Sequence, residues 1–254
     1  MARYFLTLSY NGSNFNGWQI QDNTPNTVQQ VLEEKLSMLL KEQIELVGCG
    51  RTDTGVHASH YVAHFDSKSE GLIQQKQHWI YKFNTVLPAS IAVSDIQRVK
   101  EDAHARFHAS SRTYYYYISK QKNPFRDPFT YYVYGDLDME LMNKAAAMLL
   151  QYEDFTSFSK LHSGSKTNNC TITRAEWHYC GVNEWRFRIT ADRFLRGMVR
   201  AIVGTLLLVG KNKITLSEFG AIIEARDRQL AGNNAPPQAL FLCGIQYPKD
   251  LFLE

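Results

Sequence analysis

Two successive runs of the chain show the same order of strand-like and helix-like periods, and this repetition constrains the fold more than any other feature. In the first run we predict strands at 3–10, 44–49, 61–65 and 91–99, with helices at 26–40 and 72–83. In the second run we predict strands at 111–119, 171–179, 185–190 and 240–247, helices at 139–150, 194–209 and 216–225, and a short extra strand at 129–134. Two consecutive β-α-β-β-α-β orders predict an α+β fold. We expect two ferredoxin-like, RRM-like halves that form a cleft between antiparallel sheets.

The two runs define the expected domains. Residues 1–104 form the N-terminal ferredoxin-like domain, and residues 105–254 form the C-terminal one. No segment rich in proline or glycine separates them, so we expect the two halves to pack against each other rather than to be tethered by a flexible linker.

Composition limits the class of protein. With 254 residues, of which 44% are hydrophobic, the chain can bury a substantial core. It contains no run long enough to span a membrane, and its N-terminus lacks the apolar region of a secretory signal. Four cysteines without paired spacing favour reduced thiols and a cytoplasmic location, and the net charge of +3 permits a polyanionic partner without requiring one.

One carboxylate stands on a glycine-rich loop beyond a predicted strand. The apolar run 44–47 ends in a turn that has glycines at 48, 50 and 55, with Asp53 between them and Arg51 nearby. Glycines allow another chain to approach closely, so an acid on such a loop is placed to act on a docked molecule. A turn in which Asp53 merely caps a neighbouring amide is the alternative.

Arginines repeat along the predicted helix 194–209 and just before it. Arg193, Arg196 and Arg200 are spaced by three and four residues, so on a helix they share one face, opposite an apolar stripe. Like charges this close destabilise an isolated helix, which favours an anion lying against them. A solvated basic face is the alternative.

Four consecutive tyrosines occupy the predicted strand 111–119. The two-residue period places Tyr114 and Tyr116 on one side and Tyr115 and Tyr117 on the other. One pair can belong to the core while the other lines a groove. A packing role alone remains the alternative.

Several motifs together resemble the tRNA pseudouridine synthase A family, also called the tRNA pseudouridine(38–40) synthases. The longest is the run Gly-Arg-Thr-Asp-Thr-Gly-Val-His-Ala at 50–58. Others, in chain order, are Tyr10-Asn11-Gly12 with Gly17-Trp18-Gln19, the segment 105–116 around the tyrosines, 154–158, Met198-Val199-Arg200 with Ile202-Val203-Gly204, and 235–240. Two histidines are expected where Arg196 and Gly197 stand, aspartate at Asn11 and glycine at Ala239.

The resemblance implies an RNA isomerase that converts uridine to pseudouridine at positions 38, 39 and 40 of the tRNA anticodon arm, working as a homodimer. By resemblance, Asp53 is the catalytic nucleophile or a base at the sugar, Arg200 pairs with it, and Tyr114 contacts the target base. Arg51 fills the space that the base leaves, and Arg193 and Arg196 hold phosphates.

Other functional interpretations of the sequence have less support. His57, His60 and His64 lie close in sequence, but no cysteine or carboxylate completes a metal ligand set, and no glycine-rich phosphate loop indicates a nucleotide cofactor. A non-catalytic RNA-binding protein with two RRM-like domains is the rival class, although neither half carries the expected RNP1 run. The polar segment 159–169 is either a flap over phosphates or a mobile surface loop.

Overall fold

The computed structural model describes residues 1–22, 24–69, 71–160 and 167–253, which divide into two compact units. The first unit comprises residues 1–110 and 242–254, and the second comprises residues 111–241. Residues 161–166, in the segment for which the sequence suggests a flap, lie outside the described residues. None of the helices in the described part of the chain has the length and apolar character that a bilayer crossing requires.

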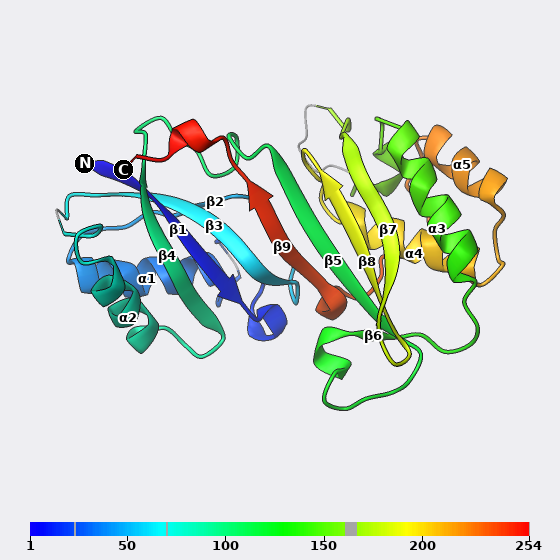
Figure 1. Ribbon diagram of the computed structural model, residues 1–254, viewed down its shortest axis with the longest axis horizontal. Coiled ribbons are helices and arrows are strands. Elements are labelled where there is room, and N and C mark those ends of the chain that lie inside the picture. The colour runs from blue at the N-terminus through cyan, green and yellow to red at the C-terminus, as the bar shows by residue number, and fades with distance from the viewer. Residues whose placement is uncertain (23, 70, 161–166, 254) are drawn as a thin grey trace. The chain divides into compact units, whose positions relative to one another are not determined.

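The first unit has the order of elements that its sequence predicts. These elements are β1 (Ala2–Tyr10), α1 (Val28–Leu40), β2 (Val47–Gly48), β3 (His57–Ser67), α2 (Lys76–Val86) and β4 (Ile91–Val99). Strand β1 lies between β4 and β3 and is antiparallel to both, while the short β2 pairs with β3. Figure 1 shows α1 and α2 together behind these strands.

Helix α1 shows why this part of the chain folds as predicted. Thr27 caps it by accepting a hydrogen bond from the backbone N–H of Gln30 at 3.3 Å, whereas Asn26, the first residue of the predicted helix, has φ of 61° and lies outside the helix. Val28, Leu32 and Leu36 follow every four residues and are completely buried. Each such side chain contributes about 1.5–3 kcal/mol through burial.

The second unit consists of β5 (Ser111–Ser119), β6 (Tyr131–Tyr132), α3 (Met139–Met148), β7 (Ile172–Gly181), β8 (Glu184–Ala191), α4 (Met198–Gly210) and α5 (Leu216–Glu224). Strand β8 lies between β5 and β7, antiparallel to both, and β6 runs parallel to β5. Helix α4 passes behind β7 and β8, and α3 lies beside β7 (Figure 1). The fold is therefore a mixture of helices and largely antiparallel strands, as the sequence predicts.

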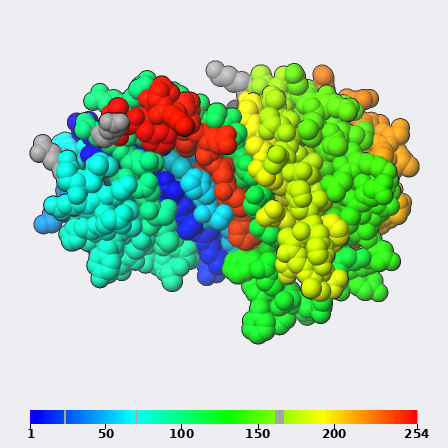
Figure 2. Space-filling model, in the orientation of Figure 1, coloured from blue at the N-terminus to red at the C-terminus, as the bar shows by residue number. Residues whose placement is uncertain are grey.

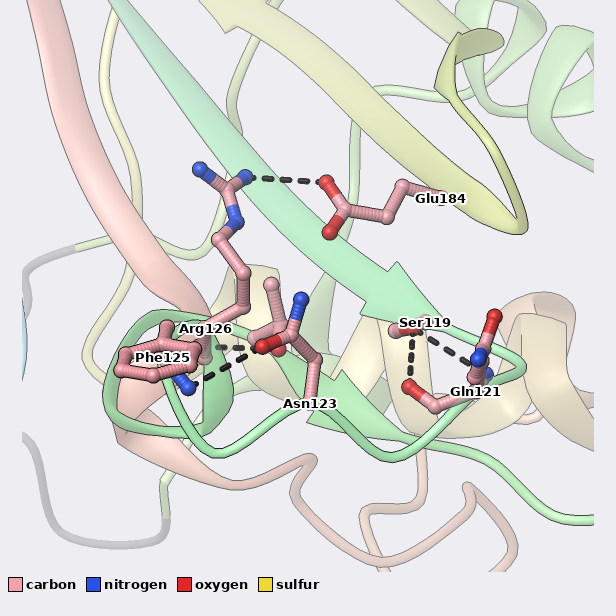
Figure 3. A network of polar contacts seen from close by, with 7 residues as sticks. Ser119, Gln121, Asn123, Phe125, Arg126 and Glu184 are labelled. Atoms are coloured by element: carbon pink, nitrogen blue, oxygen red, sulfur yellow. Dashed lines mark hydrogen bonds and ion pairs between the residues drawn. The ribbon is translucent and has the colours of Figure 1, made fainter.

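The loop between β5 and β6 is fixed to the strands at several points, which Figure 3 shows. Ser119 Oγ donates to the carbonyl of Gln121 at 2.6 Å, and Asn123 Oδ1 accepts from the N–H of Phe125 at 3.0 Å. Arg126 Nη2 lies 2.9 Å from Glu184 Oε2 at the start of β8. The loop is thus tied to both neighbouring strands.

The division between the units differs from the predicted domains 1–104 and 105–254. Strand β9 (Leu240–Gln246) begins in the second unit, but residues 242–254 belong to the first. In Figure 2 the C-terminal segment, in red, lies against atoms of the first unit. Backbone hydrogen bonds link Lys100 to Leu251, Leu253 to Arg98, and Ser110 to Gln246, so the end of the chain is attached to the first unit.

Buried polar contacts hold residues 103–105 to the first unit. Arg3 forms a two-pronged ion pair with Asp66, at 2.8 Å and 2.7 Å, and donates to the carbonyl of Ala103 at 3.1 Å. His64, only 5% exposed on β3, accepts the N–H of Ala105 at its Nδ1, at 3.1 Å. These contacts explain why the chain leaves the first unit after residue 110 rather than at 104.

The His64 contact makes the stability of the first unit sensitive to acid. Burial, with help from nearby Arg3 and His104, lowers the pKa of His64 from its usual 6.5 to about 4. Because the unfolded chain then binds more protons than the folded one between these values, the free energy of unfolding falls as pH falls from 6.5 to 4. The loss attributable to His64 is about 3 kcal/mol at pH 4.

We predict that His64→Asn removes this part of the acid sensitivity, because an amide oxygen can accept the Ala105 N–H but does not titrate in this range. Denaturant unfolding at pH 7, 5.5 and 4 measures it: the stability difference between wild type and variant should shrink by about 3 kcal/mol towards pH 4. The exposed His78 on α2 supplies the control variant, His78→Asn. Parallel pH curves for wild type and His64→Asn would contradict the prediction.

Candidate active site

The loop from 49 to 56 connects β2 to β3 and presents Asp53 at its middle. Thr52 points into the protein, where its Oγ1 lies 2.8 Å from the hydroxyl of Tyr10 and it is almost fully buried. Asp53 is half-buried and Thr54 is exposed. The carbonyl of Asp53 accepts the N–H of Val56 at 3.1 Å, which closes a tight turn and directs the chain into β3.

The segment that follows β1 presses its backbone against this loop. A side chain at Gly12 would place its Cβ 2.0 Å from the carbonyl oxygen of Val56, and one at Gly17 would place it 2.6 Å from the carbonyl oxygen of Thr52. The N–H of Trp18 donates to that same Thr52 carbonyl at 3.2 Å. Glycine is required at both positions because the two backbones are in contact.

A cluster of three aromatic residues packs next to the loop that carries Asp53. The rings of Trp18 and Tyr61 stack with centroids 4.1 Å apart, and Tyr10 packs edge-on against Tyr61 at 5.5 Å. Tyr61 donates its hydroxyl hydrogen to the carbonyl of Gly50. Sequence reasoning gave Tyr10 and Trp18 no structural role and missed Tyr61. These residues could have been identified as a cluster because all three are large aromatic residues on or next to the strands that precede and follow the loop.

The histidines near the loop act as hydrogen-bond acceptors. His57 is buried, and its Nδ1 accepts the N–H of Gly12 at 3.0 Å, as the Nδ1 of His64 accepts that of Ala105. Burial also lowers the pKa of His60. Within the described ranges, no three histidine, cysteine, aspartate or glutamate residues come together as a metal site.

A cavity of about 180 Å³ opens beside the loop within the first unit. Its lining consists of Trp18, Gln19, Val47, Gly48, Gly50, Arg51, His104, Arg106 and Phe107. Arg51 is thus placed at the cavity, whereas Asp53 is not among the lining residues. The lining combines two guanidinium groups with aromatic rings, a combination suited to a nucleotide.

In the second unit, Tyr114 lies half-buried on β5 and packs edge-on against Phe194, with ring centroids 5.1 Å apart. Tyr116 is completely buried and donates its hydroxyl to the carbonyl of Pro236 at 3.0 Å, and burial raises its pKa. Tyr115 faces the guanidinium of Arg186 at 4.3 Å. Tyr116 is therefore a core residue, while Tyr114 is partly accessible.

Arg200 is held in place by the segment that precedes β9. Its Nε donates to the carbonyl of Ala235 at 2.7 Å, and its own carbonyl accepts the N–H of Ala235 at 3.0 Å. Arg200 lies in the first turn of α4, whose neighbouring residues Met198, Ala201 and Ile202 are fully buried. The buried face of α4 thus fixes the position from which the Arg200 side chain projects.

The predicted face of three arginines on one helix is wrong. Helix α4 begins at Met198, because Gly197 before it has a left-handed backbone with φ of 73° that interrupts helical geometry. Arg193 and Arg196 therefore stand on the loop between β8 and α4. The N–H of Arg193 bonds to Asp192, and the carbonyl of Arg196 accepts the N–H of Lys160 at 3.1 Å. Arg196 itself is exposed and Arg193 is half-buried.

The predicted site residues thus fall into two groups. Arg51 and Asp53 share one loop of the first unit, and Tyr114, Arg193, Arg196 and Arg200 belong to neighbouring elements of the second. The first group lies on a loop whose backbone is fixed by contacts with Gly12, Gly17 and Trp18.

Comparison with known proteins assigns the chain to a family. The sequence model of the family described as tRNA pseudouridine synthase matches residues 7–108 and 145–248. The chain is 51% identical to "tRNA pseudouridine synthase A" of Bacteroides thetaiotaomicron over 256 residues, which cover all of this chain and 94% of that protein. Proteins of the same name from Porphyromonas gingivalis and Bacillus subtilis are 50% and 38% identical, covering 100% and 96% of this chain and 100% and 99% of theirs. The chain belongs to the tRNA pseudouridine synthase family.

Proposed function

We propose that this protein isomerises uridine to pseudouridine in tRNA, at positions 38, 39 and 40 of the anticodon stem-loop. Membership of the family supports the reaction type, and the full-length relatives carry the name tRNA pseudouridine synthase A. The observation that carries the proposal is the placement of Asp53: it stands half-buried on a loop whose backbone is fixed by contacts with Gly12, Gly17 and Trp18.

The reaction is an internal rearrangement. The C1′–N1 glycosidic bond breaks, the uracil turns, and a C1′–C5 bond forms; the proton lost from C5 is balanced by one gained at N1. No oxidant, reductant or energy source is required, so the proposal includes neither a metal nor a nucleotide cofactor. The target uridine must leave its stack to be reached, at a cost of a few kcal/mol.

We assign Asp53 as the group that acts on the sugar, either as the nucleophile at C1′ or as a base. The loop suits this task because Thr52 is fixed on Tyr10, while the next residue, Asp53, is only half-buried. A carboxylate on a rigid backbone loses little freedom when it meets the substrate. Arg51, two residues earlier, is proposed to fill the space that the flipped base leaves.

The residues of the second unit are assigned to the substrate. Arg200 is proposed to pair with Asp53; its Nε is engaged by Ala235, which orients the rest of the planar guanidinium. Tyr114 is proposed to contact the uracil, since its ring is half-buried against Phe194. Arg193 and Arg196 are proposed to contact phosphates, from a loop rather than from a helix face.

Three parts of the proposal concern the larger arrangement. We propose that each unit is a variant of the ferredoxin-like fold, which the order β4-β1-β3 with β2 on β3 supports in the first unit. We also propose that the protein acts in the cytoplasm as a homodimer, by resemblance to the family alone. Sedimentation of the purified protein tests the homodimer, and a single species at the mass of one chain would overturn it.

Replacing Asp53 by asparagine tests the catalytic assignment. Asparagine keeps the shape and turn preference of aspartate but removes the charge and the nucleophile. We predict that pseudouridine formation, measured as tritium release from C5-labelled uridine in unmodified tRNA, falls by more than about a thousandfold. Thermal stability and tRNA affinity should remain near wild type.

The control for Asp53→Asn is Asp136→Asn, which removes an exposed carboxylate paired with Lys120 in the second unit and should leave turnover unchanged. If Asp53 only caps its turn, Asp53→Asn should retain measurable turnover. If the wild-type protein binds tRNA and releases no tritium, the protein is instead a non-catalytic RNA-binding protein.

Salt dependence tests the assignment of Arg196. A phosphate contact releases counterions, so Arg196→Ala should weaken tRNA binding and reduce the slope of log K against log salt concentration by about 1. Lys144→Ala is the matched control, because Lys144 is an exposed cation on α3 already paired with Glu140. The slopes are obtained by measuring tRNA binding at about 50 to 300 mM salt, where counterion release dominates the salt dependence. Identical slopes for wild type and Arg196→Ala would place this arginine away from the RNA.

A further inference from the structure

An exposed aromatic ring stands on a fixed backbone at the edge of the cavity in the first unit. Phe107 is 72% exposed. His104 Nδ1 accepts the N–H groups of Arg106 and Phe107, at 3.1 and 3.3 Å, and His108 Nδ1 accepts that of His104 at 3.1 Å. The N–H of His108 returns to the carbonyl of His104 at 3.0 Å. These hydrogen bonds fix the backbone of the turn at 104–108. Its largest apolar side chain, that of Phe107, nevertheless faces solvent.

The ring of Phe107 is also oriented by its neighbours. The imidazole of His104 lies against it with ring centroids 4.2 Å apart, and the guanidinium carbon of Arg106 lies 5.6 Å from its centre. Burial, followed by the charge of Arg3, lowers the pKa of His104, which favours the neutral imidazole at neutral pH. The neutral imidazole of His104 thus packs against the ring of Phe107, and the guanidinium of Arg106 lies over that ring.

A single exposed aromatic residue is common on protein surfaces and by itself indicates nothing. Phe107 differs because it borders the cavity of about 180 Å³ that Arg51, Arg106, Trp18 and Gln19 also line. Aromatic rings that stack on bases, beside cations that meet phosphates, are the recurring elements of single-stranded nucleic acid sites. The amide nitrogen of Gln19 is held by Gln29 at 2.9 Å, so this wall of the cavity is also fixed.

The sequence sets how far this cavity can be from the reacting nucleotide. Arg51 lines the cavity and Asp53 follows two residues later. Two residues span at most about 7 Å of backbone, so a nucleotide seated against Arg51 neighbours the one at Asp53.

We propose that this cavity is a subsite for the nucleotide next to the target uridine, whose base stacks on Phe107 and whose phosphate meets Arg106. The subsite rests on the proposed function and specifies it further: Phe107 is a positioning residue that holds the flanking strand while the target base is displaced. Stacking tolerates any base, so the subsite contributes affinity and register rather than sequence preference.

Binding of unmodified tRNA to Phe107 variants tests the subsite. Phe107→Ala should raise Kd between about five- and a hundredfold, the range for loss of one base–aromatic stack, whereas Phe107→Trp should bind as tightly as wild type or more tightly. Phe125→Ala is the matched control, since Phe125 is 89% exposed on the loop shown in Figure 3 and belongs to the second unit. This variant should bind like wild type.

A second measurement separates stacking from a structural role. Two tRNAs are prepared, one abasic at the nucleotide before the target uridine and one abasic at the nucleotide after it. On one of them Phe107→Ala should change Kd less than twofold relative to wild type, because the base that the ring holds is already missing. An equal loss on both abasic tRNAs and on intact tRNA, or no loss on intact tRNA, would overturn the subsite. A changed sedimentation coefficient for Phe107→Ala would also overturn it, since the ring would then contact protein.

Turnover and binding measured on the same protein preparations distinguish failure of the subsite from failure of the proposed function. Wild-type protein that forms pseudouridine, together with Phe107→Ala that binds normally, rejects the subsite and retains the function. Wild-type protein that forms none rejects the function, and the subsite with it.

Discussion

The contact between two backbones, that of the segment after β1 and that of the loop 52–56, is the feature on which the site depends. It is possible only because Gly12 and Gly17 lack Cβ atoms, which would otherwise lie 2.0 and 2.6 Å from carbonyl oxygens of the loop. Hydrogen bonds at the carbonyl and the hydroxyl of Thr52 fix this residue, and with it the backbone from which the Asp53 side chain projects. A side chain on a fixed backbone has less freedom to lose when it is ordered.

The buried histidines of the first unit extend this support. His57 joins the Asp53 loop to Gly12, and His64 joins β3 to Ala105, in each case by accepting a backbone N–H at Nδ1. His104 in turn shapes the turn that carries Phe107. A group of histidines that looks in sequence like potential metal ligands therefore serves as a set of neutral acceptors for N–H groups that burial would otherwise leave unsatisfied.

Local pattern was sufficient for part of this structure and insufficient for the rest. The strands β4 and β5 have the predicted bounds, since their alternation depends only on neighbouring residues. The predicted start of α4 is too early because apolar spacing continues back to Leu195, whereas the left-handed backbone of Gly197 prevents the helix from starting before Met198. The attachment of residues 242–254 to the first unit and the hydrogen bond from Tyr61 to Gly50 could not be predicted, because both depend on tertiary contacts that local sequence patterns do not show.

In the second unit, as in the loop of Asp53, a glycine allows two backbone segments to lie in direct contact, here next to Arg200. A Cβ at Gly204, one turn after Arg200 on α4, would lie 1.8 Å from the carbonyl oxygen of Asn233, so the segment before β9 can lie directly on the helix only at a residue without a side chain. That close contact brings Ala235 within reach of both the carbonyl and the Nε of Arg200. In both units, close main-chain contact at a glycine thus fixes the backbone near a proposed site residue. Substitutions at these glycines should consequently impair the site even though none of them takes part in the chemistry.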